Sequence, residues 1–363
     1  TPSQQNWQPY NSLKKPGQMR AQSYQTVAHG ADTIQFFQLR RSVGGCEKFH
    51  GAVIAHAGTA DTRVFREVTQ LGKELEKIGS RVMGSENHAK VGIIFDWENY
   101  WALEYTSGPN RDLRYVDQIE QMYNYFYNKN IAVDMIPIDA DFSKYDLVAA
   151  PVLYMVKDGV AESLEAYVQA GGTLITYMSG IVGQSDNVHL GGYPGPLRKM
   201  AGVWVEEIDA LAPEQRNKIR FADGTEEECR LVCDLMHLEG AEEIAQYEND
   251  FYAGMTAVAK NQFGKGTVYY VGTDLSESGL AKVLAMAADG AAIRPVIGEA
   301  TALEITKRQA DGEDLYFIIN FKDEEIPLPA VFDGKEDILT GEKVQGGEML
   351  KKYDLRIVSV PRA

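Results

Sequence analysis

The residues Gly44–His50, GGCEKFH, place a carboxylate, an amine, an aromatic ring and an imidazole on one glycine-hinged loop. Glu47 and His50 are the groups that could do chemistry, because a carboxylate and an imidazole can each take up or release a proton. Both could equally hydrogen-bond to the hydroxyls of a ligand. An ion pair from Glu47 to Arg40 or Arg41 is the purely structural alternative. We interpret the loop as part of a polar-ligand site and expect the chain to carry only part of that site.

Two aromatic residues join this candidate set. Phe37 ends the run Thr33–Phe37, whose β-branched and aromatic residues predict a buried strand. In a barrel of alternating strands and helices, the active-site residues lie where strands end and loops begin. Trp7 lies between Asn6 and Gln8, and an aromatic face among amides is what a sugar or a base would stack on. A tryptophan packed on the surface is an equally open interpretation of Trp7.

Three further motifs give weaker signals. Met178-Ser179-Gly180 follows a predicted strand, but Tyr177 stands where the pattern G-x-S-x-G has its first glycine. Gly191–Pro196, GGYPGP, lacks the lysine of a phosphate loop and indicates architecture or an interface. Asp96-Trp97-Glu98 places two carboxylates at a strand end, with no basic or nucleophilic residue tied to them in the sequence.

The three cysteines, Cys46, Cys229 and Cys233, are too few and too odd in number for a disulfide framework, which indicates a reducing cytoplasm. Cys229 and Cys233 make only a weak metal-binding trio with His237, so we expect no metal and no cofactor. An amidotransferase is also disfavoured, because no cysteine follows a strand and an acidic stretch is a poor place for a thiolate.

Composition limits the class of protein. A chain of 363 residues is expected to form two or three domains, and contents of 44% hydrophobic and 24% charged residues are typical of a soluble globular protein. The formal charge of −16 argues against a nucleic acid or an anionic membrane as partner, whereas a neutral small molecule fits it. We find no signal peptide and no run of ~20 apolar residues. The chain starts at Thr-Pro rather than Met, so we expect its natural beginning to be missing or removed.

Hydrophobic periodicity predicts three kinds of segment. Before residue 86, a helix at Leu13–Ala28, the strand Thr33–Phe37 and a helix at Thr62–Ile78 stopped by Gly79 resemble an unfinished barrel. The next segment alternates strands and helices, which indicates a doubly wound, mostly parallel sheet; its elements are Lys90–Phe95, Tyr115–Lys129, Ala132–Ile136, Leu147–Ala150, Ala161–Ala170, Thr173–Tyr177, Thr267–Val271 and Gly279–Asp289. Short strands then predict a small antiparallel β domain; they are Leu303–Lys307, Leu315–Phe321, Ile338–Leu339 and Leu355–Val360.

Several motifs resemble the β-galactosidases of glycoside hydrolase family 42. They are Thr1–Asn11, Ala28–Thr33, Gly44–Ala52, the GGYPGP turn and Ile338–Val344, and the resemblance covers essentially the whole chain. It implies an α/β protein in three parts. Residues 1–85 would be the carboxy-terminal part of a (β/α)8 catalytic barrel. Residues 86–293 would be a flavodoxin- or amidotransferase-like trimerisation domain, and residues 294–363 a small antiparallel β-sandwich.

The resemblance also assigns roles. The family hydrolyses terminal β-D-galactosyl residues with two glutamates in a retaining mechanism, which requires carboxyl groups about 5–5.5 Å apart. By position, the nucleophile would lie just before Thr1 and the acid/base far earlier, so this chain would hold no catalytic residue and be inactive alone. The galactose-contacting positions match Trp7, Phe37, Glu47 and His50. The resemblance thus implies that Glu47 and His50 bind sugar hydroxyls and that Trp7 and Phe37 form the wall of the pocket. At Leu39 the family commonly has Trp.

Two functions therefore remain open. The first is part of a β-galactosidase that binds a β-galactoside and assembles as a homotrimer, for which the aromatic helix Tyr115–Lys129 could supply a contact surface. The second is a non-catalytic sugar-binding or oligomerisation module. The two differ in whether a glutamate-bearing barrel segment belongs to the same polypeptide or complex.

Overall fold

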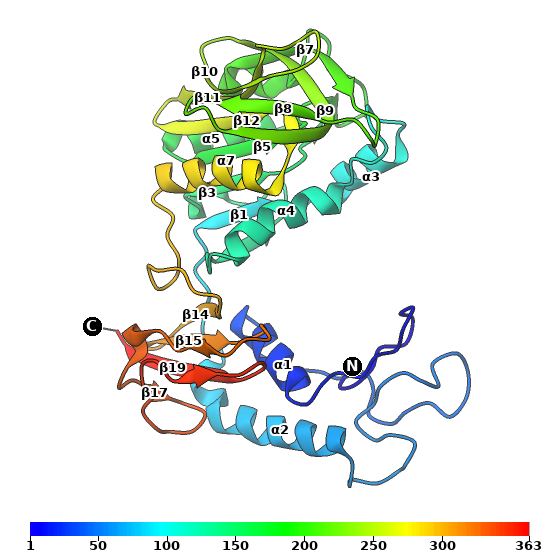
Figure 1. Cartoon of the computed structure of the whole chain (residues 1–363), viewed down its shortest axis with the longest axis vertical. Coiled ribbons are helices and arrows are strands. Elements are labelled where there is room, and N and C mark those ends of the chain that lie inside the picture. The colour runs from blue at the N-terminus through cyan, green and yellow to red at the C-terminus, as the bar shows by residue number, and fades with distance from the viewer. Residues whose placement is uncertain (363) are drawn as a thin grey trace. The chain divides into compact units, whose positions relative to one another are not determined.

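The computed structural model describes residues 1–362 and divides them into two compact units. Unit 1 combines Thr1–His88 with Pro295–Ala363, and unit 2 is Ala89–Arg294. Each unit is therefore described by itself below and can be followed in Figure 1. Within residues 1–362, no helix combines the length and the apolar character that crossing a membrane requires.

Unit 1 packs two helices against a small antiparallel sheet. The helices are α1 (Gln18–Ala28) and α2 (Arg63–Val82). The sheet has the order β14-β15-β19-β17, and its strands are β14 (Glu304–Ala310), β15 (Glu313–Ile319), β19 (Leu355–Pro361) and β17 (Glu336–Asp337). A second pair joins β16 (Ile326–Pro327) to β18 (Met349–Leu350), and a short helical turn η3 covers Ala330–Phe332.

The two faces of the small sheet bury different partners. Side chains such as Phe317 and Ile357 pack on Tyr24 and Leu71 from the two helices. The opposite face, which includes Ile318, packs on the loops of the same β region. A core of this kind needs both ends of the chain, because residues 1–88 contain helices but no strand to cover them.

One fully buried arginine ties these parts of unit 1 together. The guanidinium of Arg308, on β14, donates to the carbonyl oxygens of Val27 at 2.8 Å, Ala31 at 3.0 Å and Ser85 at 2.6 Å. It also pairs with the Asp32 carboxylate at 2.8 Å. These acceptors lie at or just beyond the carboxy-terminal ends of α1 and α2, where helix carbonyls lack partners within the helix.

Several expectations for residues 1–88 were wrong in detail. Thr33–Phe37 forms no strand; the pairing nearby is an isolated bridge between Arg40 and Ile54. A strand needs a neighbour to bond with, and none lies beside this run in the described chain. Helix α1 begins at Gln18 rather than Leu13. Gly79 does not stop α2, which continues to Val82 because the buried face of Leu71 and Ile78 extends to that residue.

Unit 2 is built on an eleven-stranded mixed sheet. One part is parallel, with neighbours in the order β2-β1-β3-β5-β12, which is the order found in flavodoxin-like sheets. Its strands are β1 (Val91–Ile94), β2 (Val133–Ile136), β3 (Leu147–Ala150), β5 (Thr173–Tyr177) and β12 (Gly266–Val271). Every residue of β1, β3 and β5 is buried, as expected for strands covered on both faces.

The helices of unit 2 flank this sheet, and Figure 1 shows α4 and α7 side by side on the same part of it. They are α3 (Trp97–Tyr105), α4 (Tyr115–Tyr127), α5 (Val160–Ala170), α6 (Arg198–Ala201) and α7 (Glu277–Gly290), with short turns η1 (Phe142–Lys144) and η2 (Gly195–Leu197). The strand–helix alternation predicted between residues 90 and 177 is confirmed, with element ends shifted by at most two residues, although helix α3 was not predicted.

The antiparallel half of the sheet was not predicted from sequence. It extends the parallel half through β7 (Val203–Ala210), β8 (Asn217–Phe221), β9 (Glu226–Leu238), β10 (Glu242–Tyr247), β11 (Thr256–Phe263) and β13 (Thr273–Leu275). A separate parallel pair joins β4 (Met155–Val156) to β6 (Val182–Gly183). In the last part of the chain, Ile338–Leu339 is a turn, because the strand there is only β17.

Removing the guanidinium of Arg308 tests the link within unit 1. Arg308→Met keeps an apolar stem but leaves buried carbonyls and Asp32 without a donor, so we expect unit 1 to lose about 3–5 kcal/mol of stability. Hydrogen-exchange mass spectrometry should show faster exchange in peptides from 1–88 and 295–362, with 89–294 as internal reference. The matched control is the exposed Arg362→Met, and equal exchange in both variants would contradict the assignment.

A buried carboxyl gives unit 2 a pH dependence. Burial raises the pKa of Asp234 from 3.8 to about 8, against the opposing effect of the hydroxyl that Tyr270 donates to it. Between about pH 4 and 8, Asp234 is therefore protonated in the folded unit but ionised in the unfolded chain. Because the folded state then binds more protons, the stability of unit 2 falls as pH rises through this range.

Asp234→Asn should remove this loss of stability at higher pH. The free energy of unfolding of the variant minus that of wild type should increase with pH between 4 and 8, by at most about 1.4 kcal/mol per pH unit. Denaturant titrations at several pH values measure it. The exposed Asp158→Asn serves as control, and parallel curves for Asp234→Asn and wild type would show that Asp234 is already ionised at low pH.

Candidate functional site

The amino-terminal segment and the glycine-hinged loop are fastened together by three hydrogen bonds. The side-chain amide of Asn6 donates to the carbonyl of Cys46 at 2.8 Å, and the amide of Gly51 donates to the carbonyl of Gln4 at 2.8 Å. The indole Nε1 of Trp7 donates to Oε1 of Glu47 at 3.2 Å. Two of the predicted site residues, forty positions apart, are thus in direct contact.

The other two predicted residues also meet. The rings of Phe37 and His50 are 5.2 Å apart between centroids and lie edge to face, at 83°. His50 is only 7% exposed, and its Nδ1 is buried without a hydrogen-bond partner within residues 1–362. A buried polar atom of this kind carries a desolvation cost until a polar group pairs with it. Trp7 and Phe37, by contrast, are 65% and 56% exposed and present open ring faces.

The structural alternative for Glu47 is wrong. Within the described residues, Glu47 forms no ion pair with Arg40 or Arg41; Arg41 instead donates to the side chain of Gln4 at 3.2 Å. Glu47 lies in a turn in which its own carbonyl accepts the amide of His50 at 3.0 Å. The turn therefore places the carboxylate and the imidazole on one short stretch of backbone.

This arrangement suits binding better than bond cleavage. It offers one carboxylate acceptor, one imidazole and two aromatic surfaces, which together fit a ligand with hydroxyls on its edges and an apolar face. A retaining glycosidase needs two carboxyl groups across the scissile bond, and only Glu47 among the four residues supplies one. Leu39 is 67% exposed, so it too is available to a ligand.

Sequence reasoning did not single out the residues that hold this arrangement. Gln4 and Asn6 anchor the amino-terminal segment, and Gly51 lies so close to Gln4 that a Cβ at this position would come within 2.6 Å of its carbonyl oxygen. The signals available were the glycine directly after His50 and the run of amides before Trp7. Neither signal predicts contact across forty residues.

Two weaker candidates prove to be structural. Ser179 is fully buried; its hydroxyl contacts Thr176, donates to the carbonyl of Tyr177 at 2.9 Å and accepts from the amide of Leu153 at 3.3 Å. It is therefore not an accessible nucleophile. In the GGYPGP turn, a Cβ at Gly180 would meet the carbonyl of Pro194 at 1.9 Å, so this turn is packed as architecture.

The expectation for Asp96 and Glu98 was wrong. A basic residue is tied to both, because Lys157 pairs with Asp96 at 2.8 Å and also contacts Glu98. Asp96 in addition accepts the backbone amide of Asn99 at 3.0 Å as the amino-terminal cap of α3. These carboxylates therefore have a structural role at the amino-terminal end of α3.

Cys229 and Cys233 are buried, whereas Cys46 is exposed. Within residues 1–362, no three or more His, Cys, Asp or Glu side chains are arranged to hold a metal ion. Hydrogen bonding with Cys233, together with burial, raises the pKa of the Cys229 thiol and disfavours a thiolate there, whereas the same hydrogen bond lowers the pKa of Cys233. All three cysteines are free.

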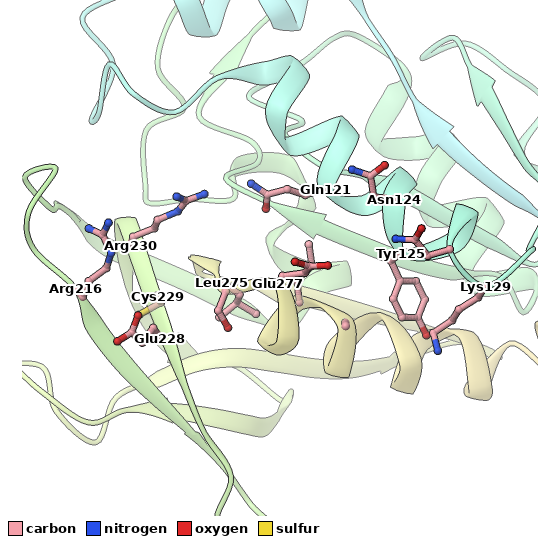
Figure 2. A pocket seen from close by; sticks show the side chains of 14 residues that line it. Gln121, Asn124, Tyr125, Lys129, Arg216, Glu228, Cys229, Arg230, Leu275 and Glu277 are labelled. Carbon is pink, nitrogen blue, oxygen red and sulfur yellow. The ribbon is translucent and has the colours of Figure 1, made fainter. Parts of the chain in front are cut away.

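Unit 2 contains a separate cavity of about 690 Å³ (Figure 2). Its lining comes from α4, α7 and the start of the antiparallel strands, and includes the polar side chains Gln121, Asn124, Arg216, Arg230 and Glu277. Arg230 is held by the buried Asp274 at 2.7 Å. None of the four predicted site residues lines this cavity. It is a hollow of mixed polar and apolar lining in unit 2 and not part of the Glu47 site.

Comparison with known families gives three matches along the chain. Residues 1–78 match the profile described as "Beta-galactosidase", residues 89–294 that of the "Beta-galactosidase trimerisation domain", and residues 302–359 that of the "Beta-galactosidase C-terminal domain". The second match alone covers more than half of the chain.

Individual relatives agree with these profiles. The chain is 50% identical over 359 residues to the β-galactosidase LacZ of Lactobacillus acidophilus and 47% identical over 365 residues to BgaA of a Planococcus species. These alignments cover 98% and 99% of this chain but 53% and 54% of the relatives. The chain thus spans about half the length of the curated relatives it matches.

Solved structures show the same relationship. The β-galactosidase of Bacillus circulans sp. alkalophilus superposes with a TM-score of 0.95 at 44% identity, over 99% of this chain and 54% of that one. The β-galactosidase of Rahnella sp. R3 gives 0.93 at 39% identity, over 100% and 54%. The mixed, sheet-rich α/β fold described above is therefore that of these enzymes.

A methyl group at position 51 tests what holds the site together. In Gly51→Ala, the new Cβ must push the backbone of Gln4 away, so we expect Trp7 to lose its contact with Glu47. Hydrogen exchange of residues 1–12 should accelerate by about tenfold or more, as for the loss of one or two hydrogen bonds. Gly44→Ala is the matched control, since nothing lies within 4 Å of its Cβ. Unchanged protection in Gly51→Ala would disprove the anchoring role.

Proposed function

Because the chain belongs to family 42 of the glycoside hydrolases, the β-galactosidase family, we propose that it is part of a retaining β-galactosidase. In this proposal the chain carries sugar-binding residues, and the two catalytic glutamates lie outside its 363 residues. The substrate is a β-galactoside whose terminal β-D-galactosyl residue is released. The chain alone is then inactive.

One observation carries the proposal: the contact of Trp7 with Glu47 beside the Phe37–His50 pair. Glu47 and His50 accept and donate hydrogen bonds to the hydroxyls of galactose, and the two aromatic rings wall the pocket. The unpaired, buried Nδ1 of His50 supports a polar ligand at this place. Leu39 stands where relatives commonly have Trp and leaves a smaller apolar surface on that side.

These residues contribute to rate as well as to binding. The transition state of glycoside hydrolysis resembles an oxocarbenium ion, and hydrogen bonds to sugar hydroxyls strengthen as it forms. Glu47 fits this role because its carboxylate is oriented by the Trp7 indole and by the turn that leads to His50. It acts on the sugar without forming or breaking a covalent bond itself.

We extend the proposal to the wider arrangement that the family resemblance implies. Residues 1–85 complete a (β/α)8 barrel, residues 86–293 act as a flavodoxin-like domain that builds a homotrimer, and residues 294–363 form a small β-sandwich. The flavodoxin-like strand order in unit 2 and the match of residues 89–294 support the second assignment. The three free cysteines support a cytoplasmic location, and neither a nucleic acid nor a membrane is a partner.

A non-catalytic sugar-binding or oligomerisation module is the alternative. Two observations favour it: only one carboxylate belongs to the candidate site, and the trimerisation profile covers more than half of the chain. A sugar-binding module would also bind galactose, so hydrolysis, not binding, separates the two functions. A nitrophenyl β-galactoside should be cleaved by the polypeptide encoded by the whole reading frame and not by the 363-residue chain alone. Turnover by that chain alone would overturn the proposal.

Replacing Glu47 separates binding from covalent catalysis. In the complete enzyme, Glu47→Ala should lower kcat/KM by about 10- to 100-fold or more, since a hydrogen bond to a charged group contributes about 1.5–3 kcal/mol. A covalent glycosyl-enzyme intermediate should still be trapped with a slow fluorinated galactoside and detected by intact-mass spectrometry.

Two comparisons complete this test. Lys48→Ala changes the neighbouring exposed side chain, which bonds only to the carbonyl of Gly45 among the recorded contacts, and should retain activity. If Glu47→Ala abolished the intermediate and azide restored turnover, Glu47 would be the nucleophile and its assignment to binding would be wrong.

A further inference from the structure

The cavity of about 690 Å³ in unit 2 has the size of a small-molecule site, since such sites commonly measure about 300–1,000 Å³. It lies between α4, α7 and the first residues of β9 (Figure 2). Leu275, Leu280 and Cys229 line it and are buried, which gives the cavity an apolar floor. Polar side chains from both walls surround this floor, as in sites that bind small molecules.

The guanidinium of Arg230 is held in the cavity by a buried carboxylate. Its Nε donates to Asp274 at 2.7 Å, and Asp274, which is 2% exposed, also accepts the side-chain amide of Gln118 at 3.0 Å. The two terminal nitrogens of Arg230 have no recorded partner within residues 1–362. Figure 2 shows this guanidinium directed toward Gln121 on the opposite wall. A planar guanidinium with a free end binds a carboxylate or a phosphate through two parallel hydrogen bonds.

Arg216 brings a second guanidinium to the same end of the cavity. The pairing of β8 with β9 places Asn217 opposite Cys229, so Arg216 and Arg230 are the next residues on the two strands. The Nη1 of Arg216 donates to the carbonyls of Pro213 at 2.8 Å and Gln215 at 2.6 Å, which fixes the direction of this side chain. Two oriented guanidiniums thus lie at neighbouring positions of one wall.

The opposite wall supplies amide groups from α4 and its carboxy-terminal cap. Gln121, Asn124 and Asn128 follow one another at spacings of three and four residues, which places them along one side of the helix. In the described part of the chain, none of these three side chains has a recorded hydrogen bond. An amide can donate and accept at once, so this row matches the hydroxyl groups of a ligand.

Charge decides which ligand fits this combination. The chain has 52 acidic against 36 basic residues, whereas cations outnumber carboxylates in the cavity lining. The charged residues of the lining are Lys129, Arg216, Arg230, Glu228 and Glu277. Asp274, which pairs with Arg230, brings the total to neutrality. A ligand with one anionic group suits such a site, because the arginines bind the anion and the amides and Glu277 bind hydroxyls. A polyanion or a cation would meet unmatched charge.

We propose that this cavity binds a small hydroxylated organic anion, either a sugar acid or a sugar phosphate. The anionic group lies against Arg230 and Arg216, the hydroxyls lie against the amides of α4, and the carbon skeleton lies on the apolar floor. This site is separate from the Glu47 site, because none of the residues that line the cavity belongs to that site. The inference does not depend on the proposed hydrolysis of a β-galactoside.

Isothermal titration calorimetry of the 363-residue chain tests the inference, with glucuronate and glucose 6-phosphate as probes. At least one of them should bind with a Kd of about 1 mM or lower. Glucose lacks the anionic group and acetate lacks the hydroxyls, so both should bind at least about tenfold more weakly. Binding of glucuronate alone identifies a carboxylate as the preferred anion, and binding of glucose 6-phosphate alone identifies a phosphate. Hydrogen exchange should slow in peptides from residues 115–129 and 226–238.

Variants in the two walls test the contacts. Arg230→Met should weaken binding by about 10- to 100-fold, as for the loss of hydrogen bonds to a charged group. Gln121→Met should weaken it by about threefold or more and leaves the pairing of Arg230 with Asp274 in place. Arg111→Met is the matched control, because Arg111 is an exposed arginine of the same unit that does not line the cavity. Circular dichroism checks folding; should Arg230→Met unfold, Gln121→Met decides.

Three results would overturn the inference. The first is that neither anionic sugar binds at about 10 mM. The second is that binding persists unchanged in every folded variant of the two walls. The third is that Glu47→Ala removes the binding, which would place the sugar at the Glu47 site instead. Failure of the complete enzyme to hydrolyse a β-galactoside would refute the proposed function and leave this cavity as a separate question.

Discussion

The Arg308 guanidinium is the contact on which unit 1 depends. Its two terminal nitrogens donate to four acceptors, at Val27, Ala31, Asp32 and Ser85, while its Nε has no partner within residues 1–362. Residues from both ends of the chain are thereby fixed to one strand of the small sheet. Helices α1 and α2 bury their apolar faces only because that sheet covers them.

The candidate site is organised differently, by short-range contacts between two loops. Gln4 and Asn6 hold the loop that carries Glu47, and Gly51 permits the close approach. No regular strand supports these residues in the described chain, so their geometry depends on a few hydrogen bonds. A binding role suits such a place, since it offers acceptors and ring faces without a second carboxylate. The identity of the chain as a β-galactosidase relative accounts for why those groups are present together.

Unit 2 fills the carboxyl edge of its doubly wound sheet with its own side chains. The carboxyl ends of the parallel strands are covered by Asn99 and by the Lys157 ion pairs. The antiparallel extension shifts the open space to the cavity beside Arg230. Residues 89–294, which match the profile described as the β-galactosidase trimerisation domain, thus combine a flavodoxin-like strand order with an antiparallel extension.

The sequence by itself determined the elements whose signal is local. The buried strands at residues 91–94, 147–150 and 173–177 and the helices α4, α5 and α7 follow from apolar runs, periodicity and glycine stops. The four candidate site residues were also named from sequence, through motifs. Tertiary structure alone decided the rest. Thr33–Phe37 has strand composition but no neighbour to bond with, Gly79 lies within a helix that packing extends, and the long strand β9 alternates too irregularly for a period to reveal it. Contacts such as Trp7 to Glu47, and the burial of His50, arise between residues far apart in sequence, where no periodicity carries information.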